Sequence, residues 1–158
     1  GVMRMRIRLY NRMDLDDVLK LYYDTVHSVC AQDYSLEELD AMAPEKPNIY
    51  HWETSLEKNH TIVAVNDEDE IIGFGNIGQT GFLDRLYVDK DYLHQGVASA
   101  LVKHLENYAK VNGNNIIDTI STISSEDFFK KLGYKTLSED ISELRGERIV
   151  GYAMEKKL

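Results

Sequence analysis

The chain has 158 residues, 43% of them hydrophobic and 28% charged, which is the balance of a globular protein long enough for one domain with a buried core. Its formal net charge of −9 argues against nucleic acid as a partner and favours a cationic one. We expect neither a membrane span nor a signal peptide, because no apolar run approaches roughly 18 residues. Cys30 is the only cysteine, so no internal disulfide can form and we expect a reducing, cytoplasmic location.

The first sixty residues predict one strand and three helices. Apolar and basic residues alternate from Met3 to Leu9, which is the period of a half-buried strand. Apolar residues then recur at helical spacing from Leu15 to Cys30. Ser35-Leu36-Glu37-Glu38 is a capping-box sequence that starts a shorter helix, and the two prolines of the chain end it. Ile49 to Lys58 predicts a third helix.

Three strands and one long helix follow. The strands are predicted at Thr61 to Asn66, Ile71 to Ile77 and Phe82 to Val88, and the turns rich in Asp and Gly between them favour an antiparallel meander. Gly96 then opens an amphipathic helix, whose apolar residues recur at steps of three and four until Asn112-Gly113 ends it.

The remaining residues predict a strand, a helix and a final hairpin. The strand runs from Ile116 to Thr119, the helix from Ser124 to Leu132, and the hairpin joins Tyr134 to Leu144 with Glu147 to Lys156. Because no repeat, linker or low-complexity tract interrupts this order, we expect residues 1–158 to form one α/β (α+β) domain.

The turn before the long helix has the properties of an anion site. The first turn of a helix carries backbone N–H groups without partners and the positive end of the helix dipole. Three small residues, Gly96, Ala98 and Ser99, leave those N–H groups open to a phosphate. The turn fits neither the GxxxxGK[ST] nor the complete GxGxxG pattern.

The turn and a second stretch resemble the GNAT superfamily of N-acetyltransferases. Leu86-Tyr87-Val88 followed by Leu93 to Ala98 resembles motif A, a strand ending in Leu-Tyr-Val before Q/R-x-x-G-x-G/A, although Leu93 takes the Q/R position. Phe128 to Tyr134 resembles motif B, aromatic-Tyr-Glu-Lys-Leu-Gly-Phe, at the expected distance downstream. The resemblance implies the GNAT fold: a mixed central sheet of about six to seven strands and about four helices, splayed at its central parallel strands.

The resemblance also implies a coenzyme site for acetyl-CoA. In the family the pyrophosphate lies on the motif A turn and the pantetheine arm runs along the strand edge, where a backbone N–H faces the thioester oxygen. The residues that it implies here are Leu86, Tyr87, Val88, His94, Gln95, Gly96, Val97, Ala98, Ser99, Phe129 and Lys131. No metal is expected, because the histidines show no metal-ligand spacing.

Asp84 is the candidate catalytic residue. Because side chains alternate along a strand, we expect Asp84 to share one face with Phe82, Leu86 and Val88 and to be the only ionisable group there. It would take a proton from the amine, or hold the cationic amine and relay its proton through water. The alternative is a substrate-binding or structural acid, paired with Arg85 or Arg145.

Motif B of the family supplies a tyrosine that protonates the leaving sulfur, and here that position is Phe129. Either another group donates the proton, or no acid is needed, because a thiol with a pKa of about 8.5 can leave as the thiolate. The resemblance places the first helices over the acceptor end of the cleft, so His27, Tyr34 and Trp52 are candidate substrate-binding residues.

The function that the resemblance implies is acetyl transfer from acetyl-CoA to a primary amine of a small molecule or protein. The alternative is a sensor or interaction module that binds acyl-CoA with little catalysis, which Leu93 and Phe129 favour. A homodimer through the exposed C-terminal strand is also possible on this pattern. The sequence does not specify the acceptor amine.

Overall fold

The computed structural model describes residues 4–158, and its seven strands form one sheet. The strand order across the sheet is β1-β2-β3-β4-β5-β7-β6. The strands are β1 (Arg6–Leu9), β2 (His60–Val65), β3 (Ile71–Ile77), β4 (Phe82–Val88), β5 (Ile116–Thr122), β6 (Lys135–Leu144) and β7 (Glu147–Lys157). Neighbouring strands are antiparallel except for β4 and β5, which are parallel. The predicted mixed α/β fold is therefore confirmed.

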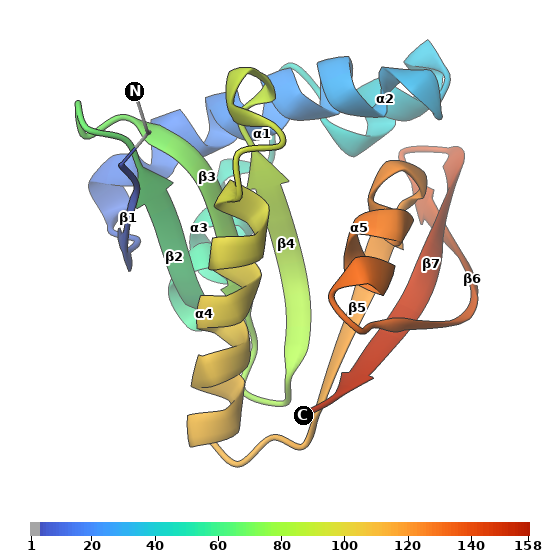
Figure 1. Cartoon of the computed structure of the whole chain (residues 1–158). Helices are drawn as coiled ribbons and strands as arrows, with labels where there is room; N and C mark the ends of the chain where they lie inside the picture. Colours follow the sequence, from blue (N-terminus) through green and yellow to red (C-terminus); the bar gives the residue numbers. More distant parts are fainter. Residues whose placement is uncertain (1–3) are drawn as a thin grey trace.

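Five α-helices cover the two faces of this sheet. They are α1 (Leu15–Val29), α2 (Leu36–Met42), α3 (Ile49–Lys58), α4 (Val97–Val111) and α5 (Glu126–Lys131). In Figure 1, α4 and α5 lie in front of the sheet and α3 lies behind it, while α1 and α2 cross the end toward which β4 points. None of the helices in residues 4–158 is long and apolar enough to cross a membrane.

Each face of the sheet has its own hydrophobic core. On the front face, the predicted stripe of α4 is almost completely buried at Val97, Leu101 and Leu105. On the back face, α1 and α3 pack through Val18 and Trp52 against strand residues such as Phe74. The amphipathic pattern thus fixes α4 on one face and α1 and α3 on the other.

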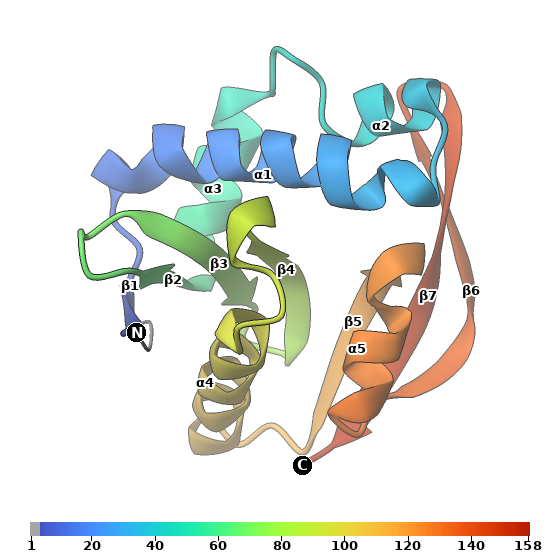
Figure 2. The same ribbon diagram turned by 45° about the horizontal axis from the view of Figure 1, so that its top comes forward.

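The sheet is splayed between its two parallel strands. β4 and β5 pair only at Phe82 with Asp118 and at Leu83 with Thr119. Beyond these pairs the strands diverge, as Figures 1 and 2 show, although β4 remains paired to β3 as far as Val88. The facing edges of β4 and β5 therefore carry backbone groups without strand partners, which an extended ligand can use.

The segment after α1 joins the two diverging halves at their far end. The Tyr34 hydroxyl donates to Val150 O of β7 (2.6 Å) and accepts from the Ile123 N–H (3.0 Å). Ser124 Oγ donates to the carboxylate of Asp33 (2.6 Å). Figure 2 shows α1 running across this end of the sheet. The splayed region is thus closed by strand pairing at one end and by side-chain contacts at the other.

Most predicted element bounds agree with the structure within two residues, and two bounds depart from it by three residues. The first strand begins at Arg6, and Met3, where it was predicted to begin, lies outside the described residues. β5 runs three residues further than predicted, to Thr122, because β7 pairs with it throughout. The following α-helix begins at Glu126, since the Ser125 hydroxyl caps a short turn of 3-10 helix, η4 (Ile123–Ser125).

Candidate active site

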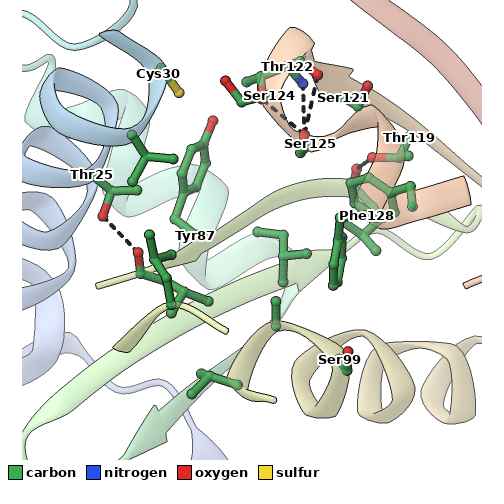
Figure 3. A pocket seen from close by; sticks show the side chains of 18 of the residues that line it. Thr25, Cys30, Tyr87, Ser99, Thr119, Ser121, Thr122, Ser124, Ser125 and Phe128 are labelled. Carbon is green, nitrogen blue, oxygen red and sulfur yellow. Dashed lines mark hydrogen bonds between the residues drawn. The ribbon is translucent and has the colours of Figure 1, made fainter. Parts of the chain in front are cut away.

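A cavity of about 740 Å³ occupies the splayed region. Its walls come from β4, β5, the starts of α4 and α5, and the C-terminal part of α1 with the following 3-10 turn η2 (Cys30–Gln32). Figure 3 shows the side chains that line it, with α1 on one side and the β5–η4 segment opposite. We call this cavity the cleft.

The start of α4 forms an open turn at one end of the cleft. Gly96 is the N-cap of α4 with φ of 83°, a left-handed conformation that favours glycine. His94 is also left-handed, with φ of 60°. The first intrahelical bond runs from Ala100 N to Gly96 O, so the N–H groups of residues 97 to 99 have no partner within the helix. This turn can bind an anion through backbone N–H groups and the helix dipole.

The coenzyme residues predicted from the motifs gather around the cleft, with two exceptions. Leu86, Tyr87, Val88, His94, Gly96, Val97, Ala98, Ser99 and Phe129 line it. Gln95 lies in the same turn but outside the lining. Lys131 is exposed near the end of α5 and also lies outside the lining. Leu93 lines the cleft too and packs against the front core, which explains an apolar residue at a polar motif position.

A β-bulge in β4 decides where Asp84 points. Asn76 of β3 pairs with Arg85, and Ile77 pairs with Leu83, so Asp84 is an extra residue between two pairs. The carboxylate of Asp84 lies 3.4 Å from Ser55 Oγ of α3, whereas Leu86 packs on the α4 face. The prediction that Asp84 shares a face with Phe82, Leu86 and Val88 is therefore wrong. The bulge turns Asp84 to the face of α3, at the point where β4 and β5 separate.

Asp84 is paired with the next residue of its own strand. Arg85 Nη1 lies 3.4 Å from the Asp84 carboxylate and also donates to Ser55 Oγ. The guanidinium of Arg85 stacks over the Trp52 ring, 4.0 Å from its centroid. The Asp84 side chain is 36% exposed and lines the cleft, so it can still meet a cationic group. Arg145, the other candidate partner, instead donates to Ala41 O (2.7 Å).

Motif B packs as an aromatic wall. Phe129 is 3% exposed and meets Phe128 and Tyr134 edge to face, with ring centroids 5.3 and 5.1 Å away. The Tyr134 hydroxyl donates to Glu106 (2.9 Å), and burial together with that carboxylate raises the pKa of Tyr134. Tyr134 lies outside the lining of the cleft, so it does not replace the tyrosine that Phe129 lacks.

The three predicted substrate-binding residues lie behind the wall of the cleft. His27 Nε2 lies 2.8 Å from Ala43 O at the end of α2. Tyr34 is buried, and its hydroxyl is occupied by the two backbone contacts described above. Trp52 packs between Arg85 and Tyr22, and it lines a second cavity of about 420 Å³ on the outer side of α1. The structure does not bring these three side chains together in the cleft.

Several cleft residues have no counterpart in the motifs. Thr25 and Cys30 of the α1 region face the hydroxyl groups of Thr122, Ser124 and Ser125 across the cleft (Figure 3). Burial raises the pKa of the Cys30 thiol to about 11, so the thiol is neutral at pH 7. The signal that sequence reasoning missed is the run of hydroxyl residues from Thr119 to Ser125, several of which line the cleft.

No group of three or more His, Cys, Asp or Glu side chains within residues 4–158 is arranged to hold a metal ion. The cleft instead offers an anion-binding turn, a free strand edge and the carboxylate of Asp84. These three features lie in sequence along β4 and the start of α4. Such an arrangement suits an extended ligand with a phosphate group at one end.

Comparisons with known proteins agree with this geometry. The chain is 26% identical over 153 residues to YafP of Escherichia coli K12, an uncharacterized N-acetyltransferase, covering 97% of this chain and 96% of that protein. A GCN5-related N-acetyltransferase from Rhodopseudomonas palustris superposes with a TM-score of 0.95 at 25% identity, covering 100% and 99% of the two chains. The PaiA N-acetyltransferase of Thermoplasma acidophilum, solved in complex with coenzyme A, superposes with a TM-score of 0.82 at 21% identity, covering 99% and 100%. The sequence pattern of the acetyltransferase (GNAT) domain matches residues 30–158, and with most of the chain matched, this protein belongs to the GNAT acetyltransferase family.

Proposed function

We propose that the protein transfers the acetyl group of acetyl-CoA to a primary amine of a small molecule or protein, by direct attack within a ternary complex. The observation that carries this proposal is the free edge of β4, which leads from Asp84 to the open turn at Gly96. Relatives of the same fold have been solved with coenzyme A or acetyl-CoA, which supports the same cosubstrate here.

In this proposal the coenzyme lies along β4. Its pyrophosphate binds the turn from His94 to Ser99, and its pantetheine arm follows the edge at Leu86 to Val88. A backbone N–H of that edge faces the thioester oxygen and stabilises the charge that develops there. Holding thioester and amine together is the largest gain, since orientation supplies roughly 7 to 11 kcal/mol of the barrier.

The transfer requires a neutral amine, because a protonated nitrogen has no lone pair. An ordinary primary amine with a pKa of about 10.4 is almost entirely protonated at pH 7. Asp84 attracts this cation and passes its proton to water. The nitrogen then forms a bond to the acetyl carbon, the C–S bond breaks, and the electron pair leaves on sulfur. The nitrogen loses its second proton to water, which leaves the neutral amide. The thiolate is tolerated or protonated by water, because Phe129 cannot donate a proton.

The remaining parts of the proposal concern partners and location. The net charge of −9 suits a cationic acceptor and not a nucleic acid. The single cysteine fits a reducing compartment such as the cytoplasm. The C-terminal strand β7 lies between β5 and β6, so the prediction that it is a free edge for a homodimer is wrong. β6 is the edge strand, and its free backbone groups would allow a homodimer. A second candidate function is acyl-CoA binding without efficient transfer, which the absence of a tyrosine at Phe129 favours.

The test is release of free thiol from acetyl-CoA in the presence of polyamines, aminoglycosides, amino acids and basic peptides. We expect turnover with at least one amine, and a loss of at least about tenfold in Asp84→Asn. Asp118→Asn is the matched control, because Asp118 is an exposed carboxylate at the same strand pairing but outside the cleft lining. Acetyl-CoA binding without turnover for any amine would favour the second function, and equal losses in both variants would reject the role of Asp84.

A further inference from the structure

The hydroxyl groups that line the cleft differ in whether they already form hydrogen bonds within the protein. Most are engaged: Thr25 donates to Val88 O (2.9 Å), Thr119 to Leu83 O (2.8 Å), Ser124 to Asp33 (2.6 Å), and Thr122 and Ser125 contact each other (2.9 Å). Ser99 is exposed on the first turn of α4. Ser121 Oγ is sealed from solvent and has no partner among residues 4–158. The hydroxyl of Tyr87 takes part in none of these hydrogen bonds, and its side chain lines the cleft.

Tyr87 presents its side chain on the face of β4 opposite to the coenzyme edge residue Leu86. Its ring packs edge to face on Tyr22 of α1, with centroids 4.8 Å apart, and stacks near Phe74 of β3. Leu86 packs on the α4 face. Figure 3 shows the Tyr87 ring standing in the cleft with its hydroxyl pointing toward the end formed by Cys30 and Ser124. The hydroxyl thus lies beyond the strand edge, on the side of α1.

The neighbouring Tyr22 decides whether the Tyr87 hydroxyl donates or accepts a hydrogen bond between the two. Tyr22 donates its proton to Met42 O (2.9 Å), so its oxygen can only accept from Tyr87. Burial raises the pKa of Tyr87 well above its ordinary range, with further contributions from Tyr22 and Cys30. The side-chain hydrogen bond between the two tyrosines, in which Tyr87 donates, raises the pKa of Tyr87 further, and no other group within residues 4–158 shares a hydrogen bond with this hydroxyl. Its oxygen therefore keeps free lone pairs directed into the cleft, and it stays neutral.

We infer that the Tyr87 hydroxyl binds the acceptor amine, accepting a hydrogen bond from its N–H and aiming the nitrogen lone pair at the thioester. This inference rests on the proposed function. A neutral oxygen suits the task, because an amine that has already lost a proton still carries N–H donors but no charge. As the C–N bond forms, positive charge grows on nitrogen and its N–H becomes a stronger donor. The hydrogen bond is then stronger in the transition state than in the ground state, which is the condition for faster catalysis.

The surroundings of the Tyr87 hydroxyl favour a neutral acceptor nitrogen, because the charged group that acts on this hydroxyl is the cation Arg85, which repels an ammonium group. The groups around the hydroxyl are Thr25, the neutral thiol of Cys30, and the hydroxyls of Thr122 and Ser124. The nearest acid on this side, Asp33, is already bonded to Ser124. The amine is therefore bound here in its neutral form, after its proton has been lost near Asp84 at the other end of the acceptor face.

The experiment compares Tyr87→Phe with the parent chain in steady-state acetyl transfer to the best amine of the panel. Phenylalanine keeps the ring and its packing on Tyr22, and the backbone along the coenzyme edge is unchanged. We expect kcat/KM for the amine to fall by at least about tenfold, the KM for acetyl-CoA to stay within about twofold, and the melting temperature to be unchanged within about 2 °C. Tyr108→Phe is the control, because Tyr108 stacks on His60 outside the cleft lining, and it should keep full activity.

Several outcomes would overturn the inference. If Tyr87→Phe keeps its amine kcat/KM within about twofold in an active enzyme, the hydroxyl does not bind the amine, although the proposed function stands. If the variant loses acetyl-CoA binding together with activity, the hydroxyl serves the coenzyme and not the amine. If the variant fails to fold, the hydroxyl is structural. If the parent chain acetylates no amine, the proposed function itself fails, and the inference fails with it.

Discussion

The buried hydroxyl of Tyr34 offers a direct test of how the two halves of the splayed sheet are held together. It donates to Val150 O at 2.6 Å and accepts from Ile123 N–H at 3.0 Å, so one oxygen joins β7 and the end of β5 to the segment after α1. Burial raises its pKa to about 12 despite the donor at Ile123. Tyr34→Phe removes this oxygen and leaves the ring in place.

The expected cost follows from the two hydrogen bonds. Each contributes about 1 kcal/mol net, and the carbonyl and N–H left behind are only partly reachable by water, which adds to the loss. We therefore expect the free energy of unfolding to fall by about 2 to 3 kcal/mol. For a chain of this length that corresponds to a melting temperature lower by about 4 to 12 °C.

The assay is urea denaturation followed by circular dichroism, with Tyr50→Phe as the control. The Tyr50 ring is 78% exposed, so its variant should unfold with the parent chain. A loss below about 0.5 kcal/mol in Tyr34→Phe would refute the reasoning, because the hydroxyl would then hold nothing together. The same variant also tests the predicted acceptor role of Tyr34, since a higher KM for the amine at a temperature where the variant is fully folded would support it.

Two further perturbations test packing and charge. A Cβ at Gly151 would overlap the backbone oxygen of Ser121. Gly151→Ala should therefore separate β5 from β7 and lower the free energy of unfolding by about 1 to 3 kcal/mol, measured by urea denaturation. An unchanged denaturation midpoint would contradict this. For Asp14, burial alone would raise the pKa, but hydrogen bonds from Arg8 and from Asn11 N–H outweigh it and lower the pKa. Asp14→Asn should therefore cost about 1 kcal/mol at pH 7, allowing for solvent at Arg8. Because the pKa of Asp14 is lowered in the folded protein, the stability difference between the parent chain and Asp14→Asn should be complete above the ordinary pKa of 3.8. It should shrink as the pH falls through the folded pKa. If melting curves from about pH 7 to about pH 2 show no narrowing of this difference, the ion pair is excluded.

Local signals made the coenzyme turn and the ends and buried faces of several helices predictable. Gly96 adopts the left-handed conformation that a glycine before a helix suggests, with φ of 83°. Ser35 caps α2 through the predicted capping box with Glu38. The apolar stripe of α4 is buried as its period indicates. In each case the residues that carry the sequence signal lie within a few positions of the structural feature that they predict.

The position of Asp84 was not predictable from its own strand. Alternation assigns a face only where a strand is regular, and the bulge depends on how Asn76 and Ile77 of β3 pair with β4. No residue of β4 indicates this irregular pairing in the sequence. Asp84 lines the cleft and pairs with Arg85, one of the two candidate partners named from the sequence, whereas its contact with Ser55 appears only in three dimensions.

The acceptor half was least predictable, because its side chains are fixed by distant contacts. Tyr34 bonds to Val150, 116 residues along the chain. His27 approaches Ala43, and Trp52 is covered by Arg85. A helical pattern places these residues on the correct elements, but whether they face the cleft or the layer behind it depends on packing between elements. The acceptor roles of His27, Tyr34 and Trp52 therefore stay predictions.

The central claim is that acetyl-CoA binds along β4 with its phosphates at the start of α4, and calorimetric titration of acetyl-CoA tests it most directly. Ser99→Glu adds a carboxylate at the exposed first turn of α4, where the helix dipole tolerates it but phosphates are repelled. Ser138→Glu makes the same change on exposed β6. We predict one site per chain, with affinity at least about tenfold weaker in Ser99→Glu and unchanged in Ser138→Glu. No binding by the parent chain, or equal binding by all three proteins, would contradict the claim.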